Sequence, residues 1–122
     1  MGVVNASHAP PSRTCATLRT QHLDRGPDGV LVLSGEADLA TRTMLREALA
    51  EAVAMNRERL IVDVTRLRFC DVQSAHLILR AGGTTPVHVT GSAGTVKRVL
   101  DLVDSLQRVP RDLAILDRPA GR

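Results

Sequence analysis

The sequence is almost free of aromatic side chains: it has no tryptophan and no tyrosine, and Phe69 is its single phenylalanine. Proteins that hold single-stranded nucleic acid stack the bases on aromatic rings. The arginines of this chain are scattered and form no basic run. The net charge of +3 is therefore weak evidence for nucleic acid, and we expect no nucleic-acid partner.

Long apolar runs are also missing. No stretch approaches the roughly 18 apolar residues of a membrane-spanning helix, and the N-terminal MGVVNASHAPPSR lacks the apolar segment of a signal peptide. The two cysteines, Cys15 and Cys70, fit reduced thiols better than a disulfide framework. We therefore expect a cytoplasmic protein that does not insert into a membrane.

A length of 122 residues is typical of one domain. Residues 1–13 contain proline and serine without hydrophobic periodicity, and we expect them to form a flexible N-terminal tail. The domain is expected over residues 14–117, and residues 118–122 are expected to be a C-terminal tail.

Short apolar runs predict strands at residues 15–23, 30–33, 60–64 and 86–90, the first two joined by the turn DRGPDG. The run at 60–64 is almost continuously apolar, which is typical of a strand covered on both faces. The segment LAILD, residues 113–117, fits a closing strand or a helical turn.

Amphipathic segments alternate with these strands. The clearest helix places Leu45, Ala48, Leu49, Ala52 and Val53 on one face, with Asp38 or Thr41 as its N-cap. A second helix, ended by glycines 82 and 83, is expected to bury Val72, Ala75, Ile78 and Leu79, and a third to bury Val96, Val99, Leu100 and Val103 with Ser92 as its cap. Alternating strands and helices predict an α/β fold with a mixed sheet of four or five strands and helices packed on it.

Catalytic signatures are weak. None of the four histidines pairs with a Cys, His or acid at a metal-ligand spacing, and no serine lies in a nucleophile elbow. Residues 90–95, TGSAGT, lack the ending of a P-loop, although free amides at a helix start can attract an anion. A helix start lowers the pKa of a thiol such as Cys70, but the charge of Asp71 opposes this. We expect no metal, no cofactor and no enzymatic activity.

The stretch FCDVQSAHLIL, residues 69–79, stands out because Asp71 and two polar residues, Gln73 and Ser74, begin a helix where a buried strand has just ended. Asp71 is suited to cap the free amides of the first helical turn. The loop around it is a candidate surface for a partner.

Three segments together resemble the STAS domain, and more narrowly the bacterial anti-sigma factor antagonists: GEADLATRTMLREAL, LIVDVTRLRFCDVQSAHLIL and VHVTGSAGTVKRVLDL. The family's Gly-Glu-x-Asp block is matched by Gly35, Glu36 and Asp38, and its strand ending in Asp-x-Ser or Asp-x-Thr is matched by Asp63 and Thr65.

The third block of the family, Phe-x-Asp-Ser-Ser-Gly-Leu, is matched only in part. Phe69 and Asp71 agree, but Val72 and Gln73 replace the two serines and Ser74 replaces the glycine. Members of this kind carry a phosphorylatable serine in that pair, and the added charge releases the kinase. Ser74 could serve as a substitute phospho-site, but one helical step rotates it by about 100° from the usual position.

The resemblance implies a protein-interaction module that binds an anti-sigma factor with a histidine-kinase-like ATPase fold and so frees a sigma factor indirectly. It implies a partner surface formed by Glu36, Asp38, Asp71, Val72, Gln73 and Ser74. Two alternatives stay open: a non-phosphorylated STAS scaffold in a sensory or transporter complex, and a small nucleotide- or anion-binding module near Ser92.

Overall fold

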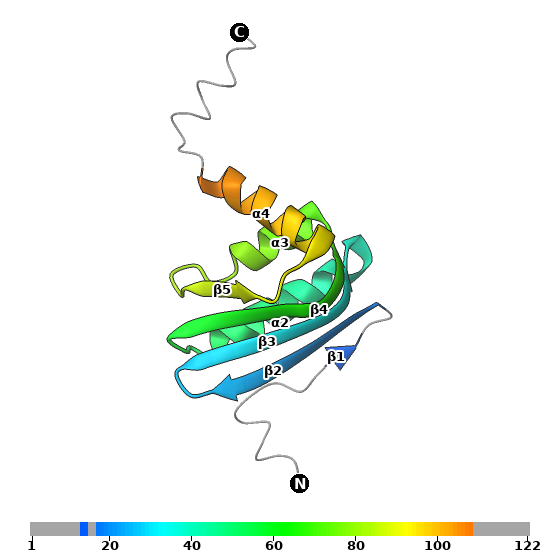
Figure 1. Ribbon diagram of the computed structural model, residues 1–122. Helices are drawn as coiled ribbons and strands as arrows, with labels where there is room; N and C mark the ends of the chain where they lie inside the picture. Colours follow the sequence, from blue (N-terminus) through cyan, green and yellow to red (C-terminus); the bar gives the residue numbers. More distant parts are fainter. Residues whose placement is uncertain (1–12, 15–16, 109–122) are drawn as a thin grey trace.

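The computed structural model describes residues 13–14 and 17–108 (Figure 1). Its sheet has five strands in the order β1-β2-β3-β4-β5: β1 (Arg13–Thr14), β2 (Leu18–Arg25), β3 (Asp28–Ala37), β4 (Arg59–Cys70) and β5 (Val87–Thr90). The pairs β1–β2 and β2–β3 are antiparallel, whereas β3–β4 and β4–β5 are parallel. The predicted α/β fold with a mixed sheet is confirmed.

The strands are longer than their apolar runs. β3 continues from the run at 30–33 to Ala37, and β4 continues from the run at 60–64 to Cys70. Both extensions are held by the parallel pairing of the two strands, which ends with Ala37 opposite Cys70. Arg13, expected in the N-terminal tail, lies in β1 opposite Thr20.

The helices follow the strands as the sequence predicts. A single 3₁₀ turn, η1 (Leu39–Thr41), leads into α2 (Arg42–Ala54); α3 (Val72–Leu79) follows β4, and α4 (Gly94–Arg108) follows β5. The expected face of α2 is buried at Leu45, Ala48, Leu49 and Ala52. On α4, Val96, Leu100 and Val103 are buried. The expected cap of α4 is wrong, because Ala93 accepts the bond from the Lys97 amide and Ser92 lies one residue too early.

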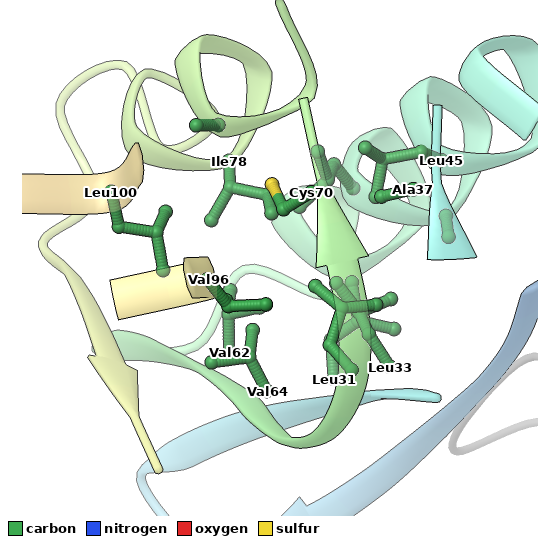
Figure 2. Packing of buried hydrophobic residues seen from close by; sticks show 14 of the residues in the cluster. Leu31, Leu33, Ala37, Leu45, Val62, Val64, Cys70, Ile78, Val96 and Leu100 are labelled. Carbon is green, nitrogen blue, oxygen red and sulfur yellow. The ribbon is translucent and has the colours of Figure 1, made fainter. Parts of the chain in front are cut away.

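One hydrophobic cluster joins the helices to the sheet (Figure 2). Leu60, Val62 and Val64 of β4 point into it and are almost fully buried, together with Leu31 and Leu33 of β3. Side chains of α2, α3 and α4 all join this cluster, so the helices cover one face of the sheet.

Within the described ranges, no helix covers the other face of the sheet. Ile61 and Asp63, which alternate with the buried residues of β4, are partly exposed. The prediction that residues 60–64 are covered on both faces is therefore wrong. Ile61 makes the run look continuous because it lies opposite Val30 of β3, in an apolar row of the open face.

Several predictions lie outside the described residues. They are the character of residues 1–12 and 118–122, the state of Cys15, and the choice between strand and helical turn for residues 113–117.

Candidate partner-binding surface

The carboxyl ends of β3 and β4 bring two turns together. Because these strands are parallel, η1 and α3 both begin at the same edge of the sheet. The amide of Asp71 donates a hydrogen bond to the carbonyl of Ala37 at 3.0 Å. This bond joins the two segments that follow β3 and β4, which the sequence analysis identified as separate motifs.

Asp71 caps helix α3 and also links the start of α3 to the start of α2. One carboxylate oxygen accepts from the amide of Ser74 at 2.8 Å, and the other accepts from the guanidinium of Arg42 at 3.0 Å. The side chains of Asp71 and Arg42 are only 28% and 22% exposed. The predicted capping role is confirmed, and Asp71 also ties the start of α3 to the start of α2.

Asp38 forms a reciprocal capping box with Thr41. The amide of Thr41 donates to the Asp38 carboxylate at 3.2 Å, and the amide of Asp38 donates to the Thr41 hydroxyl at 3.0 Å. The Thr41 hydroxyl also donates to the carbonyl of Glu36 at 3.0 Å. Of the two predicted caps, Asp38 caps η1 through its side chain, whereas Thr41 occupies the N-cap position of α2 but makes no side-chain cap bond to that helix.

The start of α3 is rotated relative to the predicted buried face. Ser74 is 0% exposed, whereas Val72 is 51% exposed and Gln73 is also exposed. Ala75 and Ile78 are buried as predicted. The expectations of a surface Ser74 and a buried Val72 are wrong, because the cap from Asp71 to the Ser74 amide fixes the first turn and directs Ser74 inward.

An apolar patch, defined here as Leu39, Phe69 and Val72, lies at this edge. Their exposed fractions are 75%, 46% and 51%. Phe69 lies opposite Glu36 in the sheet. Glu36 in turn approaches the guanidinium of Arg68 at 4.0 Å, with side chains 39% and 74% exposed. Exposed apolar residues inside a charged rim are the usual composition of a protein-binding surface.

Sequence reasoning included Val72 in the surface but missed Leu39 and Phe69 as exposed residues. The available signal was that both large apolar residues lie outside the periodic core positions, each directly after a charged residue, Asp38 or Arg68. Of the predicted surface residues, the structure brings Glu36, Asp38, Asp71, Val72 and Gln73 to the same edge and leaves Ser74 beneath it.

Cys70 has no nucleophilic character here. Burial, and then the nearby charge of Asp71, raises the pKa of its thiol to about 12. The thiol is therefore protonated at neutral pH. The described residues contain no group of three or more His, Cys, Asp or Glu side chains that could hold a metal ion.

The loop proposed as an anion site is packed against the sheet. Gly91 has a φ of +84°, and a Cβ atom there would collide with the Thr65 hydroxyl. The Thr65 hydroxyl donates to the Asp63 carboxylate at 2.6 Å. Glycine is therefore needed at position 91, because the loop approaches β4 too closely there to leave room for a side chain. In the part of the chain described, no helix is long and apolar enough to span a membrane.

The sequence matches the family model described as "Mlab, STAS domain" over residues 21–107, more than half of the chain. The chain belongs to the STAS domain family. Residues 21–107 include β3, β4, β5, α2, α3 and all of α4 except Arg108. The candidate surface of this STAS domain, formed by residues between 36 and 74, therefore lies inside the matched segment.

Solved structures of STAS proteins share its fold. An anti-sigma factor antagonist from Mycobacterium paratuberculosis aligns with a TM-score of 0.65 and 20% identity, covering 86% of this chain and 97% of that one. The anti-sigma factor antagonist SpoIIAA in its unphosphorylated form aligns with a TM-score of 0.59 and 22% identity, covering 84% and 97%. An antisigma-factor antagonist STAS domain from Rhodobacter sphaeroides has a TM-score of 0.51 and 19% identity, covering 64% and 90%. No curated protein matches this STAS domain.

Proposed function

We propose that this STAS domain is a non-enzymatic protein-interaction module that binds an anti-sigma factor of the histidine-kinase-like ATPase class and so frees a sigma factor. The observation that carries the proposal is the apolar patch of Leu39, Phe69 and Val72 at the edge where α2 and α3 begin. Two of the similar solved structures are named as anti-sigma factor antagonists and a third as the STAS domain of one.

The composition of this edge supports binding of a protein. Five large apolar residues are exposed in the described part of the chain, and three of them form the patch. Glu36, Arg68 and Gln73 add polar side chains at the same edge of the sheet. Apolar anchors that become fully desolvated supply most of the binding energy in protein interfaces, while rim charges favour the correct partner.

We further propose that binding is not switched by phosphorylation. Val72 and Gln73 carry no hydroxyl, and the hydroxyl of Ser74 belongs to a side chain that is 0% exposed. Phosphoryl transfer requires the acceptor oxygen in line with the γ-phosphate. Reaching Ser74 would require the first turn of α3 to open and to lose its cap from Asp71.

A second candidate is a constitutive STAS scaffold in a sensory or transporter complex. The burial of Ser74, the serine at the start of α3, favours it, and so does the description of the matching family model, which names a STAS domain of the Mlab type. The same apolar patch would then bind a structural subunit. The cytoplasm is the expected location for both candidates.

The test is affinity purification from the source organism with three baits: the wild-type chain, Val72→Asp, and Leu102→Asp. Leu102 is 55% exposed on α4, so it is a matched control for the 51% exposed Val72. We expect an ATP-binding anti-sigma factor to be recovered with wild type and Leu102→Asp but lost with Val72→Asp. Recovery of a transporter ATPase with the same dependence on Val72 supports the scaffold instead. Equal recovery by all three baits refutes the proposed surface.

Phosphorylation is tested by incubating the chain with the recovered kinase and Mg-ATP. We expect an unchanged intact mass and persistent co-elution of the two proteins. A single phosphate mapped to Ser74, and absent in Ser74→Ala, would contradict the constitutive mode of binding. Calorimetry with ATP and GTP on the isolated chain tests the nucleotide-binding alternative near Ser92, for which we expect no heat of binding.

A further inference from the structure

A groove runs between α2 and the end of α3, away from the apolar patch. Its volume is about 350 Å³. Leu49 of α2 and Leu77 of α3 contribute apolar surface, and Ala50 and Ala81 leave space because their side chains are short. Pockets of a few hundred cubic ångströms with apolar linings are typical of small-molecule sites.

The groove has a basic rim. Arg46 lies on the α2 side and Arg80 at the end of α3, and both are exposed. Neither guanidinium makes a hydrogen bond or ion pair with another described residue, in contrast to the guanidinium of Arg42, which is held by Asp71. His76 is the remaining polar residue of the lining, and the lining contains no carboxylate. Two guanidinium groups beside an apolar floor complement a ligand with an anionic head and an apolar body.

We propose that this groove binds a single-chain anionic amphiphile, with its carboxylate on Arg46 and Arg80 and its alkyl chain over Leu49 and Leu77. A guanidinium offers paired N–H donors that fit the two oxygens of a carboxylate. The alkyl chain loses water-exposed surface against the leucines and passes through the space beside Ala50. This site uses none of the residues of the apolar patch, so it does not depend on the proposed function.

The primary experiment is a titration of the full ¹⁵N-labelled chain with sodium decanoate and sodium dodecanoate, each below its micelle concentration. We expect saturable amide shifts at Arg46, Leu49, Leu77 and Arg80. Two added methylenes should tighten binding roughly fourfold, because an open groove buries about half of the added surface. The cation dodecyltrimethylammonium has the same chain length and should give no saturable shifts at these residues.

Variants locate the site. The double variant Arg46→Gln/Arg80→Gln should weaken dodecanoate binding about tenfold, and Ala50→Leu should abolish it by filling the groove. Arg98→Gln is the matched control, because Arg98 is exposed on α4 and outside the groove. Exposed substitutions of this kind should leave the melting temperature unchanged, which confirms that each variant is folded.

The outcomes separate clearly. The groove is supported if dodecanoate binding is weakened by Arg46→Gln/Arg80→Gln and abolished by Ala50→Leu. The proposal is overturned if dodecanoate gives no saturable shifts, if Arg98→Gln weakens binding as much as the double variant does, or if the cationic amphiphile binds equally well. Shifts confined to the apolar patch would also overturn it.

Discussion

Replacing Asp71 with alanine should destabilise the domain by about 1.5–2 kcal/mol. Loss of a helix N-cap costs about 1 kcal/mol, here the 2.8 Å bond from the Ser74 amide. Loss of the partly buried pair with Arg42 adds about 0.5–1 kcal/mol, since the two side chains are 28% and 22% exposed. The larger end of the range applies if the Arg42 guanidinium is left without a replacement partner.

Two further variants separate the contribution of the cap from that of the pair between Asp71 and Arg42. Asp71→Asn keeps an oxygen that can accept from the Ser74 amide but loses the charge, so it should cost only about 0.5–1 kcal/mol. Arg42→Gln removes the pair from the other side and should cost a similar amount. The double variant Asp71→Asn/Arg42→Gln should cost less than the sum of the single variants, because both remove the same interaction.

The assay is urea unfolding followed by circular dichroism, with Asp101→Ala as the control. Asp101 lies on α4 in an exposed pair with Lys97 at 3.0 Å, and its loss should change the free energy of unfolding by no more than about 0.5 kcal/mol. If Asp71→Ala costs no more than Asp101→Ala, Asp71 does not fasten the two helix starts, and the reasoning about the candidate surface fails with it.

Three other perturbations test separate parts of the structure. Leu49→Ala should cost about 2–4 kcal/mol in urea unfolding, because Leu49 is only 4% exposed; a loss below about 0.5 kcal/mol would contradict the packing of α2. In a Cys15→Ser background, Cys70 should not react with a thiol reagent at pH 8 until the chain unfolds, since its pKa is raised to about 12, and rapid labelling of folded chain would refute its burial. The pKa of Asp63 is lowered from 3.8 because the hydroxyl and amide of Thr65 donate to its carboxylate, so its contribution to stability is present above pH 3.8 and lost as the pH falls through the folded pKa. Asp63→Asn should therefore lose less stability than wild type between pH 6 and pH 3, and equal losses would contradict this linkage.

The sequence predicted the core well where its signal was periodic. The α2 face at Leu45, Ala48 and Leu49 spans several turns, so one helical period fits it and no other does. α3 has only eight residues, and two turns define the period poorly. There the cap from Asp71 determines the rotation of the helix, and the buried residue at its start is Ser74 rather than Val72.

The strand lengths and the open sheet face could not be predicted from local pattern. Ser34, Gly35 and Glu36 look like a loop, but β2 and β4 pair with both sides of this segment and keep it extended. Whether helices cover one or both faces of a strand depends on where other segments pack. The apolar run at 60–64 therefore led to the wrong prediction of cover on both faces.

Motifs located part of the candidate surface. Asp38 and Asp71 were found because capping requires particular side chains at particular positions. The exposure of Leu39 and Phe69 could not be read from residue type, since the same side chains are buried in other contexts.

The outer strand β5 is short, with four residues. A long, flat outer strand presents a row of unpaired amides and carbonyls on which another copy of the chain can add a strand, and natural sheets avoid this by shortening such strands. Strand β5 pairs with β4 only from Leu60 to Asp63, and the longest strands, β3 and β4, lie between other strands of the sheet. The edge formed by β5 should therefore offer little template for strand addition by another copy of the chain at high concentration.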